Sequence, residues 1–204
     1  MSGWLEWVRR LQAVAQSGLH YDPRPFDRER FEEVRAVAAE MAAAGDAPAE
    51  ELLAAFAAET GHATPKLDVR ACAFRDGRVL LVRGADDGQW ALPGGWAEVG
   101  ESPRVAVEKE LREESGYRGR AVKLIGLYER DVRDRPRWPF HGWKVSFLCE
   151  LDDADPEPPQ ATEIVEVGFF AEDELPELSE RVLPSQLADA FAHARDPSRP
   201  ADFD

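Results

Sequence analysis

The stretch that decides the fold is residues 92–117, which read LPGGWAEVGESPRVAVEKELREESGY. Its Pro-Gly-Gly run at 93–95 is typical of a tight turn, where backbone can approach a ligand or a metal closely. Ser102 suits a helix N-cap, the proline after it suits the first helical position, and Gly116 suits a left-handed C-cap. The stretch therefore predicts a glycine-rich loop followed by a helix over residues 103–115.

The predicted helix carries glutamates near its C-terminal end, where they cost stability. Glu110, Glu113 and Glu114 stand at i, i+3 and i+4, so they project toward one side. Like charges at i, i+4 cost roughly 0.2–0.5 kcal/mol, and each carboxylate in the last turn opposes the helix dipole by about 0.3–1 kcal/mol. Divalent cations among the carboxylates would remove this cost, since Mg²⁺ prefers oxygen ligands. The alternative is a solvated acidic face, on which Glu108 and Arg112 would form a surface pair.

The spacing of the whole stretch resembles the Nudix box, Gly-x5-Glu-x7-Arg-Glu-U-x-Glu-Glu-x-Gly-U, where U is a bulky aliphatic residue. The matching positions are Gly95, Glu101, Glu110, Leu111, Glu113, Glu114 and Gly116. Two positions depart from the pattern. Lys109 replaces the arginine and keeps its charge, but it lacks the bidentate fork that orients a carboxylate. Tyr117 stands at the final bulky position.

The resemblance implies a fold and a metal site. The fold would be α+β, an α/β/α sandwich around a mixed sheet, in which the box carries the metals. Glu113 and Glu114 would be the principal metal ligands. Glu110 would be a further ligand or the base for water, and the Gly95 carbonyl would complete a coordination shell. The implied cofactor is Mg²⁺, with Mn²⁺ as the alternative.

Four further glutamates are candidates for the site. By the same resemblance, Glu101 would brace the helix or touch a metal, and Glu98 has a weaker claim beside the substrate. The catalytic base in this superfamily can also lie on a loop before a late strand, which is where Glu163 stands, with Glu166 as the second choice. A carboxylate near the metals can take the proton of the attacking water. The alternative for Glu163 and Glu166 is an ordinary surface residue.

The chain divides into two predicted domains. Residues 1–62 predict three short amphipathic helices, the first stopped by Gly18, the second capped by Asp27 and ended by Gly45. Such a small helical domain needs a partner surface. It is either a packing appendage or a dimerisation element, and we slightly favour a homodimer formed through it. Residues 63–204 would form the catalytic domain.

The second predicted domain mixes strands and helices. Strands at 69–74 and 78–83 are joined by an Asp-Gly pair, which is a strong hairpin signal. Further strands are expected near 122–130, 143–151 and 163–170, followed by a terminal helix that carries Leu187, Phe191 and Ala194. No regular strand–helix–strand alternation is present. The pattern therefore favours α+β with a mixed sheet over a doubly wound fold.

Composition narrows the possible functions. The 204 residues carry a formal charge of −15, which argues against a general nucleic-acid binder, although divalent cations would let an acidic enzyme take anionic phosphates. Cys72 and Cys149 are more simply two buried thiols of a reducing compartment than a disulfide. The N-terminus is no signal peptide, and no apolar run approaches the roughly 20 residues that span a membrane. The expected location is cytoplasmic.

The flanking sequence resembles one Nudix subgroup. The segments 64–74, 126–144 and 166–176, together with the helical N-terminus, are similar to enzymes related to CDP-choline pyrophosphatase and ADP-ribose pyrophosphatase. This resemblance implies cleavage of a phosphoanhydride bond in a small nucleoside diphosphate linked to another group, with release of a nucleoside monophosphate. We expect CDP-choline as the first choice of substrate and ADP-ribose as the second.

Several residues are candidates for substrate contact. The basic side chains of Arg70, Arg83 and Lys144 could hold phosphate, and His141 could contact phosphate or the leaving group. Aromatic side chains that could stack on a base are Trp90, Trp96, Phe140 and Trp143. Each has an ordinary alternative: a surface charge for the basic groups, an incidental loop residue for the histidine, and a core position for the aromatics.

Two rival functions remain open from the sequence. One is a house-cleaning hydrolase of damaged nucleoside triphosphates, which would release pyrophosphate. The other is a Nudix-fold sensor that binds a nucleotide without cleaving it. Sensors of that kind usually show eroded box glutamates and a basic appended domain, and this chain shows neither.

Overall fold

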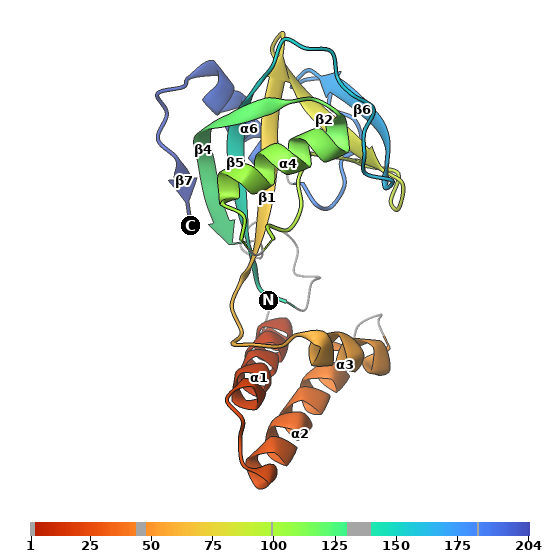
Figure 1. The fold of residues 1–204 in the computed structure, drawn as a ribbon, viewed down its shortest axis with the longest axis vertical. Coiled ribbons are helices and arrows are strands. Elements are labelled where there is room, and N and C mark those ends of the chain that lie inside the picture. Colours follow the sequence, from red (N-terminus) through yellow and green to blue (C-terminus); the bar gives the residue numbers. More distant parts are fainter. Residues whose placement is uncertain (1–2, 44–47, 99, 130–139, 183) are drawn as a thin grey trace. The chain divides into compact units, whose positions relative to one another are not determined.

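A computed structural model describes residues 3–43, 48–98, 100–129, 140–182 and 184–204. The chain forms two compact units, which are described separately (Figure 1). The first contains the N-terminal helices up to Pro65, together with Phe140 and His141. The second begins at Lys66 and contains the sheet. Gly45 and residues 130–139, to which part of the sequence predictions refers, lie outside the described residues.

The first unit contains the helices α1 (Gly3–His20), α2 (Pro25–Ala42) and α3 (Ala49–Ala58). Their apolar faces meet in a core of Leu5, Val8, Ala38, Ala39, Ala42 and Phe56. The predicted stop at Gly18 is wrong, because α1 continues to His20. Gly18 instead gives room to Phe31, whose ring atoms would lie 2.4–2.6 Å from any Cβ at this position. The predicted cap at Asp27 is also wrong: Arg24 is the N-cap, and Asp27 lies in the first turn.

The second unit is built on a mixed sheet. Its strands are β1 (Lys66–Arg75), β2 (Arg78–Gly84), β3 (Trp90–Ala91), β4 (Gly119–Glu129), β5 (Gly142–Leu151), β6 (Ile164–Phe170) and β7 (Asp202–Phe203). The order is β3-β2-β1-β5-β4-β7, with β6 also paired to β2. The pairs β1–β5 and β4–β7 are parallel, and the remaining pairs are antiparallel. The prediction of a mixed sheet is confirmed.

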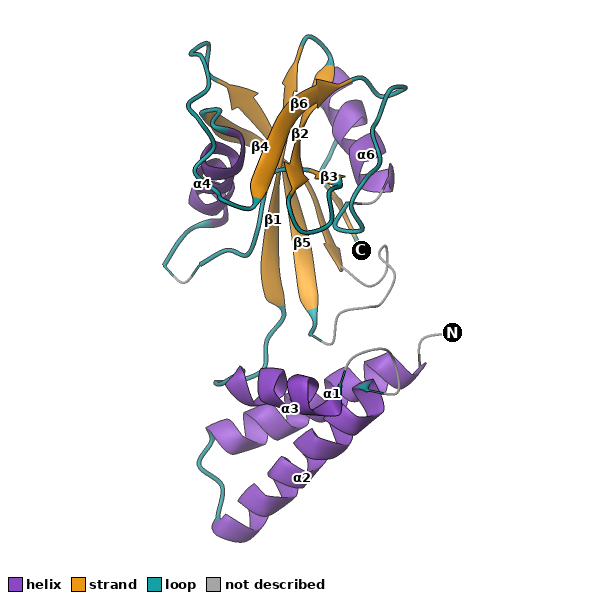
Figure 2. Cartoon of the chain, turned by 90° about the vertical axis from the view of Figure 1, so that its right-hand side faces the viewer, coloured by secondary structure: helices purple, strands orange, loops and turns teal. Residues whose placement is uncertain are grey.

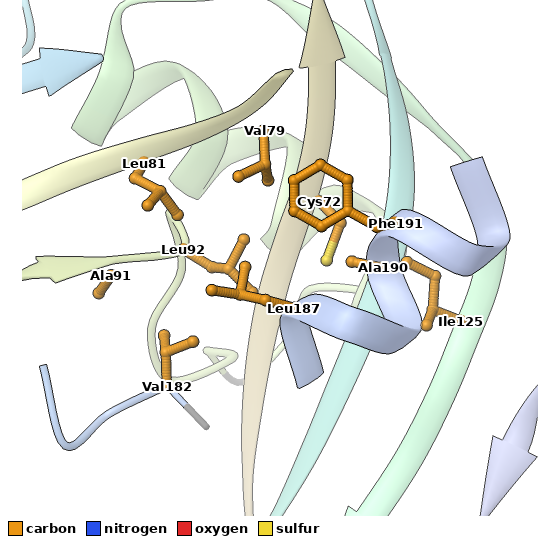
Figure 3. Close-up of a cluster of buried hydrophobic side chains, with 10 residues drawn as sticks. All are labelled: Cys72, Val79, Leu81, Ala91, Leu92, Ile125, Val182, Leu187, Ala190 and Phe191. Atoms are coloured by element: carbon orange, nitrogen blue, oxygen red, sulfur yellow. The ribbon is translucent and has the colours of Figure 1, made fainter. Parts of the chain in front are cut away.

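Helices α4 (Pro103–Ser115) and α6 (Pro184–Arg195) cover opposite faces of this sheet (Figure 2). On the α4 side, Val107 and Leu111 pack against Ala71 and other apolar strand residues. On the α6 side, Leu187, Ala190 and Phe191 lie over a cluster that includes Cys72 and Leu92 (Figure 3). The predicted α/β/α sandwich is therefore confirmed.

Local sequence signals determine the ends of α4 as predicted. The hydroxyl oxygen of Ser102 accepts the backbone N–H of Val105 at 3.3 Å, and Pro103 occupies the first turn. Gly116 ends the helix with a φ of 74° and donates its N–H to the carbonyl of Arg112. The helix that carries the box glutamates therefore begins and ends where the sequence indicated.

Cys72 and Cys149 are both buried and free. They lie on the neighbouring strands β1 and β5, but Cys149 faces Ala73 rather than Cys72 in the register. Because side chains alternate along a strand, the two thiols point to opposite faces, one into the α6 core and the other into the α4 core. This offset explains why no disulfide joins them. Among the described helices, none is both long enough and apolar enough to cross a bilayer.

Candidate active site

The glycine-rich loop at 93–95 is hydrogen-bonded along the side of β1. The backbone N–H of Val69 donates to the carbonyl of Gly95, and the N–H of Ala71 donates to the carbonyl of Pro93, each at 2.8 Å. Gly94 between them has a φ of 150°, and a Cβ there would lie 2.0 Å from the Val69 carbonyl oxygen. Only glycine fits this close approach. The Gly95 carbonyl, a predicted metal ligand, keeps one lone pair beyond its bond to Val69.

Two glutamates of α4 meet this loop. Oε2 of Glu114 accepts the backbone N–H of Gly94 at 2.7 Å. A Cβ at Gly95 would lie 3.2 Å from the carboxylate of Glu110, so the absent side chain leaves room for that carboxylate. The loop and the helix thus bring Glu110 and Glu114 together alongside β1.

Burial shifts the acidity of both carboxyls. It raises the pKa of Glu114 to about 7, opposed by the Gly94 hydrogen bond and by the positive charge of Arg70. Burial also raises the pKa of Glu110, where Lys109 and Arg70 act in the opposite direction and Glu113 adds to the increase. Two crowded, partly desolvated carboxyls therefore resist ionisation unless positive charge is supplied nearby.

Arg70 supplies part of that positive charge from within the sheet. Its side chain is buried, and it forms an ion pair with Asp68 in which Nε lies 2.9 Å from Oδ1. A second guanidinium nitrogen donates to Asp68 at 3.0 Å, and the third donates to the carbonyl of Leu92 at 3.2 Å. The alternative of a surface charge is therefore wrong for Arg70. Its donors are directed at protein oxygens, so it acts on the glutamates through its field.

Lys109, the departure from the box, bridges two acidic residues. Its Nζ lies 3.1 Å from Glu98 and 3.2 Å from Glu101. These contacts raise the pKa of the ammonium group, so it stays charged. A point charge with rotatable donors can serve two carboxylates at once without the planar fork of arginine. Lys109 thus holds Glu101 beside the start of α4.

Glu113 is directed differently from its two neighbours. Its carboxylate lies 3.5 Å from the guanidinium of Arg112, and it remains one-third exposed. The predicted surface pair between Glu108 and Arg112 is wrong, because Glu108 accepts the backbone N–H of Ala121 at 2.9 Å. Within the described part of the chain, no group of three or more histidine, cysteine, aspartate or glutamate side chains is arranged to hold a metal ion. The three box glutamates share a helix end, but their carboxylates do not converge.

The two candidates for the catalytic base differ in their surroundings. Glu163 is exposed at the start of β6, and it lies close enough to Glu114 to contribute to the rise in the pKa of that carboxyl. Glu166 forms an ion pair with Arg83 at 2.7 Å across the β2–β6 pair. Arg83 also stands 6.0 Å from the ring centre of Trp90. Glu166 and Arg83 therefore form an ion pair with each other, while Glu163 acts on Glu114 through its charge.

The remaining candidates for substrate contact are spread over both units. Trp96 is 40% exposed, and its indole lies 3.6 Å from where a Cβ of Gly142 would stand. Lys144 is buried and donates to the backbone carbonyl of Arg181, so the surface alternative is wrong for it as well. His141 groups with the helical unit, as does Phe140, whose ring packs on Phe56 with centroids 5.5 Å apart.

Sequence reasoning missed several residues around the box. Asp68 is buried as the ion-pair partner of Arg70. The two residues stand two positions apart on β1 and so share one face of the strand, and this pair of opposite charges could have been noticed in the sequence. Asp87, Ser179 and Arg181 line a narrow cavity beside Glu114. No local signal marks these three residues, because Asp87 and Ser179 are 92 residues apart in the sequence and come together only in the folded chain.

Comparison with known proteins places this geometry in a family. Residues 64–191 match the NUDIX domain, and residues 2–56 match a domain described as UDP-X-like, N-terminal oligomerisation domain. The chain therefore belongs to the Nudix family, and the resemblance predicted from the box is confirmed.

Relatives that extend beyond the box narrow the subgroup. The Bacillus subtilis (strain 168) protein named "Putative ADP-ribose pyrophosphatase YjhB" is 39% identical over 203 residues, covering 98% of this chain and 97% of its own. The crystal structure of a UDP-X diphosphatase covers 100% of this chain and 98% of its own at 33% identity, with a TM-score of 0.62. That of an ADP-ribose pyrophosphatase from Streptococcus suis covers 69% of this chain and 100% of its own at 36% identity, with the same TM-score.

Proposed function

We propose that this protein is a divalent-metal-dependent pyrophosphohydrolase that cleaves a nucleoside diphosphate linked to a second group. The observation that carries the proposal is the meeting of Glu110 and Glu114 at the Gly94-Gly95 turn, within a matched Nudix domain. The products would be a nucleoside monophosphate and the phosphorylated second group. Water adds to one phosphorus, the bond from that phosphorus to the bridging oxygen breaks, and a proton is released.

The names of the relatives set the order in which substrates deserve testing. Two of them are called ADP-ribose pyrophosphatases and one a UDP-X diphosphatase. We therefore place ADP-ribose first and UDP-linked compounds second. CDP-choline, which the sequence resemblance put first, stays a prediction without support from these names.

The residues at the box fit a hard divalent cation. Glu110 and Glu114 are oxygen donors of the kind that Mg²⁺ prefers, and burial, which raises the pKa of both carboxyls, makes their ionised forms depend on nearby positive charge. Glu113 would join them by leaving Arg112, and the free lone pair of the Gly95 carbonyl is a fourth donor. A bound Mg²⁺ or Mn²⁺ would neutralise phosphate charge and acidify a water molecule.

Three further roles are proposed for residues around the box: a catalytic base, a residue that positions Glu101, and a source of positive charge. Glu163 is the proposed base, because it is exposed and its charge influences Glu114. Glu166 is less suitable, because it forms an ion pair with Arg83. Lys109 would hold Glu101, and through it the entrance of α4, in place. Arg70 would add a positive electrostatic field at the two partly buried glutamates.

A substrate panel tests the function directly. Purified protein with Mg²⁺, and separately with Mn²⁺, is mixed with ADP-ribose, UDP-glucose, CDP-choline and nucleoside triphosphates, and the products are separated by chromatography. We expect a nucleoside monophosphate and a sugar or choline phosphate. Pyrophosphate release from a triphosphate would instead indicate the house-cleaning reaction. Tight binding of ADP-ribose without turnover would indicate a sensor.

We also propose a cytoplasmic homodimer formed through residues 1–62. The supporting observation is that Trp4 and Trp7 are 47% and 55% exposed on α1, in a segment that matches an oligomerisation domain. Light scattering of the full chain tests this. Trp4→Glu combined with Trp7→Glu should shift the mass to that of a monomer, while Val122→Glu, an exposed apolar position on β4, should leave the mass unchanged.

A further inference from the structure

A cavity on the second unit extends the site away from the box. Gly94 and Glu114 line it together with Asp87, Ser179 and Arg181. It measures about 20 Å³, which is room for about one water molecule. A diphosphate would therefore need one wall to give way.

The backbone around Ser179 and Arg181 is held in place by hydrogen bonds. Ser179 donates its hydroxyl to Asp87 at 2.6 Å, and the side-chain amide of Gln89 donates to Glu177 at 2.9 Å. Lys144, which is buried, donates to the backbone carbonyl of Arg181. The segment that carries Arg181 is thus tied to the loop before β3 and to the sheet, so its backbone does not have to move for the side chain to reorient.

The guanidinium of Arg181 is held much less firmly. Its ion-pair partner is Asp86, and the two side chains are 48% and 57% exposed. An ion pair so open to water contributes little to stability. The same guanidinium fork matches phosphate oxygens, which form strong charge-assisted hydrogen bonds with arginine. A phosphate that enters the cavity can therefore replace the aspartate.

We propose that Arg181 is a substrate-binding residue: it leaves Asp86 and takes the non-bridging oxygens of the diphosphate, opposite the box glutamates. This inference rests on the proposed function and names the residue that selects for a diphosphate at that same site. Asp86 then acts as a competitor for Arg181 and holds the side chain aside in the empty enzyme.

This role predicts opposite effects for the two halves of one ion pair. Arg181→Gln removes the phosphate contact, so binding weakens by about tenfold to a hundredfold, as expected for losing a hydrogen bond to a charged group. Asp86→Asn removes the competitor, so binding stays the same or becomes tighter. If the pair were only structural, both substitutions would have the same effect.

The test uses calorimetry of the full chain with the α,β-methylene analogue of ADP-ribose, whose bridging carbon resists hydrolysis, in the presence of Mg²⁺. Arg195→Gln is the matched control, because Arg195 at the end of α6 forms a similar exposed ion pair with Glu172. Thermal melting checks that each variant folds. The inference is supported if Arg181→Gln alone loses affinity and Arg181→Lys recovers part of it.

Three results overturn the inference: equal losses in Arg181→Gln and Asp86→Asn, unchanged affinity in Arg181→Gln, or no binding by the unmodified protein. Failure of the proposed function looks different. In that case the analogue still binds and Arg181→Gln still weakens it, but ADP-ribose and the other diphosphates are not cleaved.

Discussion

Glu114 and Gly94 are 20 residues apart, yet Oε2 of Glu114 accepts the backbone N–H of Gly94 at 2.7 Å. This bond ties the end of α4 to the loop that runs along β1. It places a carboxyl whose pKa is raised to about 7 by burial directly beside backbone that tolerates no side chain.

Neutralising the box glutamates should remove activity without unfolding the chain. We expect Glu114→Gln and Glu113→Gln each to reduce turnover of the preferred substrate by orders of magnitude, because a divalent cation would lose a charged ligand. Glu108→Gln is the control on the same helix, since an amide oxygen can still accept the N–H of Ala121. Steady-state kinetics and circular dichroism are the measurements. Unchanged turnover in Glu114→Gln would show that the metal assignment is wrong.

Lys109 should matter through the carboxylates that it bridges. Lys109→Met would release Glu98 and Glu101, and we expect kcat to fall by roughly 10–100-fold, the usual effect of losing a partner that orients ligands. Lys109→Arg keeps the charge and should retain most of the activity. Kinetics of the two variants, measured at saturating Mg²⁺, separate these outcomes. A full loss in Lys109→Arg would indicate that a lysine is specifically required.

Gly94 should be far less tolerant of alanine than Gly88, although both have positive φ. Gly88 has nothing within 4 Å of a new Cβ, so Gly88→Ala should cost only the conformational strain, about 1–2 kcal/mol. Gly94→Ala adds a clash with the Val69 carbonyl and must push the loop off β1. Urea denaturation should therefore give Gly94→Ala a clearly lower free energy of unfolding. Equal values for the two variants would mean that the loop moves freely.

His193 should make stability depend on pH. Its ring on α6 is buried, and both ring nitrogens lack a hydrogen-bond partner among the described residues. Burial lowers its pKa below 6.5, helped by Lys123 and Arg199 and opposed by Asp189 and Asp202. The unfolded chain therefore binds a proton more readily than the folded chain. Stability from this group is complete above about pH 6.5 and is lost as the pH falls toward the folded pKa.

Chemical denaturation at a series of pH values between 5 and 8, a range around the reference pKa of histidine, checks this prediction. His193→Leu should flatten the dependence, and it should be as stable as the unmodified protein or more so at neutral pH, because two unpaired buried nitrogens are removed. A pH dependence that is the same in both proteins would assign the effect to other groups.

Much of the fold was predictable because its signals are local. The cap at Ser102, the left-handed Gly116 and the Asp76-Gly77 turn each act over a few residues, so the sequence predicted the bounds of α4 and the position of the β1–β2 turn, although β1 begins three residues before the predicted strand at 69–74. Predictions that relied on single residues in the helical unit were weaker. Gly18 was predicted to end the first helix, but α1 continues past it, and the ring of Phe31 packs against it.

The family, the helix that carries the glutamates and the order of strands and helices could all be predicted from the sequence, because these depend on spacing along the chain. The folded structure was needed to show which carboxylates meet the glycine loop, that Arg70 and Lys144 are buried, and that Arg181 and Glu114 line the same cavity. The burial of a side chain and its contact partners depend on distances between segments that are far apart in sequence. No local pattern encodes those distances.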